Sequence, residues 1–251
     1  MKYGRLAPRH TLRTMRGALA IAKAYAPLGA PPSISADYVS AVDKATGGNW
    51  RLDGNSQYGD CTIADCAHQI MLHTANAGSI VIPTTAECTG LYFRLTGGPD
   101  TGLDETTVCD AMQTIGLAGQ KSAGSGMLDP ARLDHIRWTM QIFGACRLGI
   151  TIDQRFQNEF SSGLPWAQAA DPNSPTIGGH DVPVVGYDQD HAYVVTWGRL
   201  QAVTWALMAD AQFLEEAHCE VWADWVRQGD TAPSGFDLVG LLAEMPAVEA
   251  A

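Results

Sequence analysis

The stretch that decides the fold is Gly54-Asn55-Ser56-Gln57-Tyr58-Gly59-Asp60-Cys61-Thr62-Ile63-Ala64. Its glycines predict a turn, and a helix is predicted to begin at Cys61 and to end near Ala77. Apolar residues recur in that helix at the spacing of one buried face. The positive end of a helix dipole favours the thiolate form of a cysteine, and the thiolate is the nucleophile. Cys61 is therefore a candidate nucleophile, provided that the chain supplies a base for it.

Helices are predicted through most of the first half of the chain. A capping box formed by Thr84 and Glu87 opens one of them, and Pro130 stands at the start of another. The glycine-rich range 116–126 is predicted to be a flexible turn region. Besides the helix that begins at Cys61, the predicted helical ranges are 12–25, 37–45, 84–95, 104–117 and 130–144.

The second half of the chain is predicted to be rich in β-strands. β-branched residues fill 146–152, and two further runs, 181–187 and 191–198, flank a tight turn and predict a hairpin. A polar loop is predicted between the first strand and the hairpin. A helix is predicted over 204–217 and a strand over 218–225. Helices followed by antiparallel strands predict an α+β fold.

His180 stands at the head of the predicted hairpin and is the candidate base for Cys61. The two glycines before it allow a close backbone approach, and an imidazole there would hold the thiolate as an ion pair and protonate a leaving amine. Most single histidines are ordinary buried or surface residues. His68 and His73 are interpreted in that way, because five residues of separation do not place them on one helix face.

The acidic residues near the hairpin are predicted to be solvated. Strand alternation sends Asp181 to the face opposite His180, while Asp188 and Asp190 belong to the tight turn. The acids Glu215, Glu216 and Asp134 are interpreted as solvated helix faces. Core packing is predicted for the tryptophans of the second half, which are Trp197, Trp205, Trp222 and Trp225.

The composition is that of a globular chain, with 46% hydrophobic and 17% charged residues. No apolar run predicts a transmembrane span and the start does not read as a secretory signal, so we expect a cytoplasmic protein or one assembled into a particle. The six cysteines lack metal-ligand spacing, so neither a metal site nor a cofactor is expected. In a reducing compartment most of these cysteines should be free thiols.

The first 50 residues are predicted to form a basic arm. The segment before the first acid, Asp37, carries +6, which leaves −17 of the net charge of −11 for the remainder. An acidic body argues against binding to nucleic acid, because phosphate contacts need Lys and Arg. The arm is interpreted either as a solvated or self-docking strap across the acidic body, or as the contact site for a partner.

Three short blocks resemble the papain-like cysteine peptidases. The block Tyr58-Gly59-Asp60-Cys61-Thr62 is similar to the family's Cys-Gly-Ser-Cys-Trp, and Gly179–Tyr187 is similar to its His-Ala-Val-x-x-Val-Gly-Tyr strand. Thr196-Trp197-Gly198 is similar to the end of its Asn-Ser-Trp-Gly. Cys61 and His180 are 119 residues apart, slightly fewer than the roughly 130 to 150 expected. The stretches 55–64 and 194–205 also resemble papain-like proteins encoded by tailed phages.

The resemblance implies a role for each matching residue. Cys61 would be the nucleophile and His180 the general base and acid. Asn55 lies six residues before Cys61, where the family has a glutamine whose amide donates to the oxyanion, and Gln57 is the competing donor. The matching residues expected to line the substrate site are Gly59, Gly179 and Trp197.

Two departures from the family pattern bear on the chemistry. The asparagine that orients the family's histidine is absent: its place falls on Val195, or on Thr196 with a gap of one residue. A threonine hydroxyl can accept from an imidazole N–H, so Thr196 is the predicted orienting group. The family's disulfide partner before the nucleophile is replaced by Tyr58, which agrees with a reducing compartment.

The sequence therefore predicts a papain-like α+β fold, with the arm at 1–50, a helical left lobe at about 51–145 and an antiparallel right lobe at about 146–251. The predicted function is that of a cysteine peptidase or amide hydrolase acting on a peptide or protein. The alternative is a phage virion structural or accessory protein with weak or no activity, which would contact particle proteins or itself through the arm. A third hypothesis is acyl transfer to an amine. No membrane partner is expected.

Overall fold

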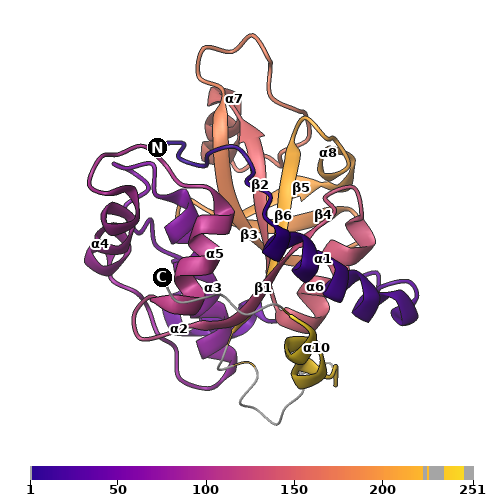
Figure 1. Cartoon of the computed structure of the whole chain (residues 1–251). Helices are drawn as coiled ribbons and strands as arrows, with labels where there is room; N and C mark the ends of the chain where they lie inside the picture. The colour runs from indigo at the N-terminus through magenta and orange to yellow at the C-terminus, as the bar shows by residue number, and fades with distance from the viewer. Residues whose placement is uncertain (1, 223–224, 226–234, 246–251) are drawn as a thin grey trace.

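The structure, a computed structural model, describes residues 2–222, 225 and 235–245 (Figure 1). The end of the strand predicted over 218–225, and much of the end of the right lobe predicted to reach residue 251, lie outside the described residues. None of the described helices is long and apolar enough to cross a membrane.

Four helices gather on one side of the strands and form the helical lobe (Figure 1). The central one, α3, is buried along almost its whole length and packs on strand β3. The predicted capping box is present at the start of α4, where Thr84 and Glu87 satisfy each other's backbone N–H groups. The four helices are α2 (Val39–Thr46), α3 (Cys61–Asn76), α4 (Thr85–Thr96) and α5 (Glu105–Thr114).

Six antiparallel strands form one sheet in the order β1-β6-β2-β3-β4-β5. The hairpin predicted around the turn at 188–190 is the β3–β4 pair. The strands are β1 (Ser122–Leu128), β2 (Cys146–Ile152), β3 (Gly178–Tyr187), β4 (His191–Thr196), β5 (Arg199–Thr204) and β6 (Leu214–Trp222).

Strand β1 corrects the prediction of a flexible turn over 116–126. It pairs with β6 although it comes from the range predicted for the helical lobe. Its glycines allow close packing: a Cβ on Gly126 would overlap the side chain of Ile21 and the backbone of Gly17, both in the helix that covers the strand. From local composition, such glycines predict a turn. In the structure they are needed because the neighbouring helix packs closely on the strand.

The helix predicted over 204–217 is wrong for most of its length. Only α8 (Trp205–Met208) is helical, and β6 begins at Leu214. The pairing of β6 with β2 skips Glu215, since Gly149 pairs with Glu216 and Ile150 with Leu214. Glu215 is exposed and Glu216 is buried, and both lie on a strand, which corrects their interpretation as a solvated helix face. The loop predicted after β2 contains the helix α7 (Gln154–Ser161).

The basic arm docks on the acidic body of the same chain. Its helix α1 (Leu12–Tyr25) packs on β1 and places Ile21 and Tyr25 in the core, and the 3-10 turn η1 (Ala26–Leu28) follows. Five of its basic residues pair with acids of the body, as Lys2–Asp100, Arg5–Glu215, Arg9–Asp104, Arg13–Asp110 and Lys23–Glu244. In this structure the arm is a strap docked on its own chain, which is one of the two interpretations made from the sequence.

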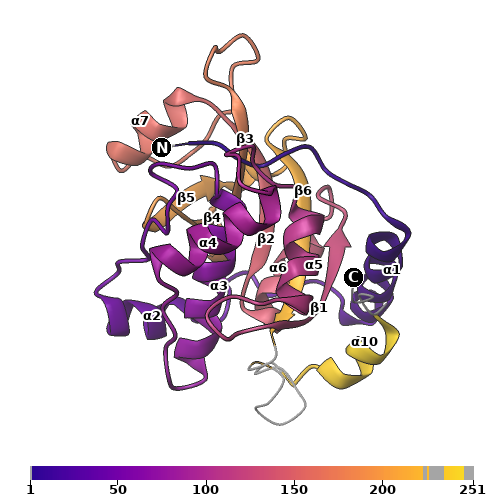
Figure 2. The ribbon, with the colours of Figure 1, turned by 60° about the vertical axis from the view of Figure 1, so that its left-hand side comes forward.

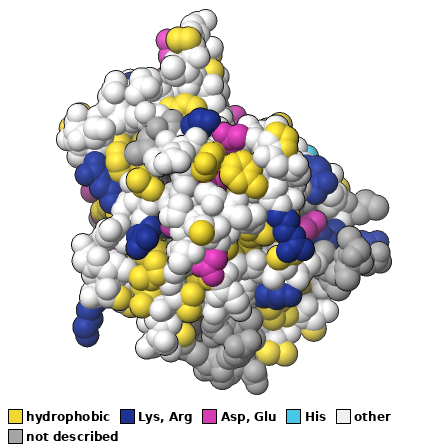
Figure 3. Space-filling model, turned by 90° about the vertical axis from the view of Figure 1, so that its left-hand side faces the viewer, with side chains coloured by type: hydrophobic (Ala, Val, Ile, Leu, Met, Phe, Trp, Pro, Cys, Tyr) yellow, Lys and Arg dark blue, Asp and Glu magenta, His cyan; other side chains and the backbone are white. Residues whose placement is uncertain are grey.

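Two further helices belong to the described part of the chain. Helix α6 (Leu133–Phe143) packs on β6, β2 and β3, and α10 (Leu238–Glu244) packs on α1. The second view shows the residues before α1 running from the neighbourhood of α7 across the molecule (Figure 2). On the face turned to the viewer in Figure 3, Lys and Arg side chains are scattered and do not form one patch.

Candidate active site

Cys61 is the first residue of α3, at the end of the glycine turn that the sequence singles out. The turn requires glycine at Gly54, whose φ is 110° and where a Cβ would overlap the carboxylate of Asp60. The thiol is 1% exposed. The local sequence therefore delivers the sulfur to the start of a buried helix, as predicted, but the sulfur does not reach solvent in this structure.

Burial controls the ionisation of this thiol. It raises the pKa of Cys61 to about 12, and the nearby Asp181 carboxylate acts in the same direction. The nearby backbone N–H groups of Asp181 and Gly4 favour the thiolate form and oppose the shift. The expected helix-dipole stabilisation of a thiolate is outweighed here, because desolvation is the larger effect.

His180 lies on β3 and faces the end of β4. Its Nε2 is hydrogen-bonded to Thr196 Oγ1 at 2.9 Å, and its Nδ1 has no hydrogen-bond partner in the described part of the chain. Burial lowers the pKa of His180 to about 3, helped by the charges of Arg5 and His68. The structure thus brings Thr196 to the histidine and leaves the other ring nitrogen free.

Trp197 covers the histidine. Its ring stacks on His180, with centroids 5.3 Å apart and an interplanar angle of 25°. Its backbone has φ 45°, which is unusual for a residue other than glycine, and the following Gly198 bridges to Arg51 of the turn. The hairpin end therefore fixes the imidazole plane from one side.

Asn55, and not Gln57, lies beside the thiol. Asn55 is buried and lines one small cavity of about 10 Å³ together with Cys61, His180 and Thr196. That volume is close to the minimum needed by one water. Gln57 is exposed and lines a different pocket. The side chain of Asn55 donates to the backbone oxygens of Lys2 and Tyr58, both at 3.3 Å.

The start of the arm, residues 2–6, lies across the thiol, and we call it the strap. The backbone N–H of Gly4 lies near enough to the sulfur to oppose the rise in the pKa of the thiol, and the Cβ position of Gly4 is filled by the carbonyl of Gly59. On the other side, the N–H of Arg5 donates to Gly179 O at 3.2 Å. The two glycines predicted to line the substrate site, Gly59 and Gly179, thus both contact the strap.

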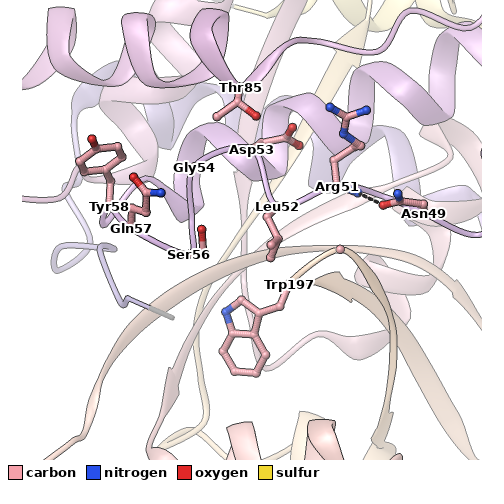
Figure 4. Close-up of a pocket in the computed structure, with 11 residues that line it drawn as sticks. Asn49, Arg51, Leu52, Asp53, Gly54, Ser56, Gln57, Tyr58, Thr85 and Trp197 are labelled. Carbon is pink, nitrogen blue, oxygen red and sulfur yellow. Dashed lines mark hydrogen bonds between the residues drawn. The ribbon is translucent and has the colours of Figure 1, made fainter.

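Open pockets lie on either side of the covered thiol. One, of about 480 Å³, is formed by the turn residues 49–58, Thr85 and the hairpin end, with Trp197 facing Leu52 across it (Figure 4). The other, of about 690 Å³, is lined by the strap, the loop before β3 and Gln157 of α7. Both volumes are in the range of ligand sites.

Several functional positions were missed from the sequence. His68 is buried, lines the same cavity as Cys61 and contacts Arg51 O at 3.2 Å. Asp181 is not solvated as predicted but fully buried and paired with Arg147. Local patterns do not reveal such pairs, because the partners come from different strands.

One group of described residues has the donor set of a metal site. Atoms of Glu105, Glu216 and His218 lie within 4.8 Å of one another, and all three residues are buried. The guanidinium of Arg5 lies next to them, with Nη1 3.6 Å from Glu216 Oε2. The guanidinium of Arg5 therefore already supplies a positive charge next to the acids of this group.

Comparison with known proteins identifies the fold. No protein-family model matches the sequence, and no curated protein is similar to it in sequence. Among solved structures, xylellain, a cysteine protease from Xylella fastidiosa, superposes with a TM-score of 0.64 at 14% identity, over 87% of this chain and 95% of that one.

Two other similar structures give the same result. The Carica candamarcensis cysteine protease CMS1MS2 has a TM-score of 0.51 at 14% identity, over 76% of this chain and 98% of that one. The cysteine protease and lectin-like domains of Cwp84 from Clostridium difficile have a TM-score of 0.53 at 10% identity, over 86% and 61%. The predicted papain-like α+β fold is confirmed.

Proposed function

We propose that this chain, whose fold is that of the papain-like cysteine proteases, is a cysteine peptidase or a related amide hydrolase that acts on peptides. The observation that carries the proposal is the cavity shared by Cys61, His180 and Asn55, in which His180 is held through Thr196 and keeps Nδ1 unpartnered. A nucleophile, a base oriented by a third group and an amide donor are the parts that acyl transfer needs.

In the proposed reaction the Cys61 thiolate attacks a peptide carbonyl. The side-chain amide of Asn55 and the backbone N–H of Cys61 stabilise the oxyanion, and His180 protonates the leaving amine. Water then releases the acyl group from the thioester. Throughout, His180 Nε2–H donates to Thr196 Oγ1, so that Nδ1 carries the proton exchanged with the sulfur.

The strapped chain would be a resting form of such an enzyme. With the pKa of Cys61 at about 12 and that of His180 at about 3, both groups are neutral at neutral pH. Departure of the strap would admit water to the thiol and remove the desolvation that separates the two pKa values. The substitution Gly4→Ala is a direct way to displace the strap, because the new methyl group would overlap the carbonyl of Gly59.

Alkylation by iodoacetamide at near-neutral pH tests the proposal. We expect slow labelling of Cys61 in the unmodified chain, faster and selective labelling in Gly4→Ala, and loss of that gain in Gly4→Ala with His180→Ala. The control is Gly90→Ala, at an α4 position where a Cβ meets no other atom within 4 Å. Peptide hydrolysis by Gly4→Ala should be abolished by Cys61→Ala.

Uniform labelling of all accessible cysteines in Gly4→Ala, together with no hydrolysis of any peptide, would contradict the peptidase proposal. The alternative role in a phage particle stays a prediction, and none of the structures named above is a phage protein. The same holds for acyl transfer to an amine, for partners of the arm and for location in the cytoplasm or a virion.

A further inference from the structure

The side chain of Arg5 projects from the strap into an acidic chamber, and one of the acids there, Glu215, reaches solvent. The Arg5 side chain is 2% exposed, its Nη2 pairs with Glu215, and its Nη1 lies 3.6 Å from Glu216 Oε2. The chamber is walled by Glu105 from α5 and by Glu215 and Glu216 from β6. The buried positive charge of the guanidinium is therefore surrounded by negatively charged groups.

Some carboxylate oxygens in this chamber lack a hydrogen-bond donor even with Arg5 in place. Glu105 is fully buried, and neither of its carboxylate oxygens has a hydrogen-bond partner in the described part of the chain. Glu216 Oε1 accepts from His218 Nε2 at 2.7 Å, but its Oε2 has no hydrogen bond. Unpartnered buried carboxylates are costly, so these oxygens are available to a donor that fits better than Arg5 does.

The neighbouring cation cannot satisfy these acids, because it is engaged elsewhere. Arg147 is fully buried and makes ion pairs with Asp65, Asp181 and Glu220, as well as hydrogen bonds to α3. Within the described part of the chain, Glu105 and Glu216 make ion pairs with Arg5 and His218. The charge of Arg147 also acts on Glu105, but Arg5 is the arginine that makes ion pairs inside the chamber.

Two glycines make the room for this occupant. A Cβ on Gly149 would overlap Glu105 Oε1 and lie 2.9 Å from Arg5 Cδ, and a Cβ on Gly179 would lie 2.5 Å from Arg5 O. Both positions belong to the paired strands β2 and β3. The cavity that takes a long basic side chain is therefore built into the sheet.

The backbone of Arg5 is placed as that of a bound peptide would be. Its N–H donates to Gly179 O, directly before His180, and the preceding residue contacts the Cys61 sulfur. A peptide that replaced the strap along the same path would direct one side chain into the acidic chamber.

We propose that the chamber walled by Glu105, Glu215 and Glu216 is the substrate pocket for an arginine side chain, and that Arg5 occupies it when the strap is in place. The inference rests on the proposed peptidase function. A guanidinium fits better than an ammonium, because its planar fork meets carboxylates on more than one side. The substrate class is then a peptide that carries arginine at a fixed distance from the cleaved bond.

The test compares arginine with citrulline, its uncharged isostere, in the Gly4→Ala chain. Short alanine peptides carry one arginine at each position in turn. We expect kcat/KM for the best arginine peptide to exceed that of its citrulline counterpart by about 10- to 100-fold, as charge-assisted hydrogen bonds contribute. Glu216→Gln should lower this ratio by about 10-fold. The exposed Glu244→Gln is the control and should leave it unchanged.

A second variant and a binding measurement make the result independent of folding and of catalysis. Glu215→Gln, at a partly exposed position, should also lower the ratio if Glu216→Gln does not fold. Fluorescence anisotropy on Gly4→Ala with Cys61→Ala should show tighter binding of the labelled arginine peptide. Tighter binding of the arginine peptide without any cleavage would support the arginine pocket and would overturn only the peptidase proposal. Equal cleavage of the two peptides, or equal binding including no binding of either, overturns the pocket.

Discussion

At the scale of single residues, the candidate site has a hydroxyl where the papain-like peptidases that the sequence resembles have an amide. Thr196 is 16 residues after His180 in sequence and 2.9 Å from it in the structure. A hydroxyl is a weaker orienting group than an amide or a carboxylate, and the stack of Trp197 on the ring supplies part of the missing constraint. Together the two contacts keep Nδ1 available.

Thr196→Val should lower the kcat of the Gly4→Ala chain by about 2- to 10-fold with little change in KM, because one neutral hydrogen bond to the base is lost. Thr196→Ser keeps the hydroxyl and should restore kcat. Steady-state kinetics with a cleaved peptide, at several pH values, gives the measurement. Thr114→Val, at an exposed position at the end of α5, is the matched control. An equal loss in the valine and serine variants would refute the orienting role.

At the scale of elements, α3 carries the proposed nucleophile at one end and packs into the core at the other. Cys61 stands at its N-terminus, whereas His73 in its last turn lies between Trp222 and Trp225, with ring centroids 5.8 Å and 4.9 Å away. Neither ring nitrogen of His73 has a hydrogen-bond partner among the described residues. The helix therefore carries a buried polar ring that the proposed chemistry does not use.

His73→Leu should raise the free energy of unfolding, and more so in acid. Burial lowers the pKa of His73 from 6.5 to about 3, so the folded state keeps it neutral while the unfolded state takes up a proton below about 6.5. The unmodified chain then loses up to about 1.4 kcal/mol per pH unit between pH 6.5 and 3 through this one residue. The variant does not.

Urea unfolding at a series of pH values measures this difference. His10→Leu, at an exposed arm position, is the control and should not change the slope. A constant difference between His73→Leu and the unmodified chain across this pH range would show that His73 does not titrate as its burial implies.

At the scale of the whole molecule, one buried charge cluster joins the two lobes. Arg147 on β2 reaches the helical lobe through Thr62 O at 3.0 Å and Asp65 at 3.2 Å. Within the sheet it pairs with Asp181 on β3 and with Glu220 on β6. Asp65 lies one turn after Cys61 on α3, and Asp181 follows His180 on β3, so the cluster connects the two elements that carry the site.

Arg147→Met should destabilise the fold by about 3–5 kcal/mol, because it leaves buried carboxylates without their cation. Thermal or urea unfolding at neutral pH gives the measurement. Arg132→Met removes an exposed pair with Asp134 and should leave stability nearly unchanged. Similar stability of the two variants would mean that the cluster does not hold the lobes together.

Much of the fold could be predicted because its signals are local. Helix α3, the capping box of α4, strand β2 and the β3–β4 hairpin follow from periodicity, caps and β-branched runs. The failures share a cause: β1 is predicted as a turn because its glycines serve packing against α1, and the start of β6, up to Ala217, is predicted as a helix although Glu216 is buried between strands. Long-range packing leaves no local pattern.

The sequence by itself determined that a glycine turn presents Cys61 at a helix start and that a hairpin begins at His180, since backbone geometry and side-chain period act over a few residues. Only the tertiary structure decided what surrounds them. It placed Thr196 on His180, laid the strap over the thiol and buried Arg5 among carboxylates. Those outcomes depend on desolvation and on contacts between residues far apart in the chain, and both arise only when the lobes pack together.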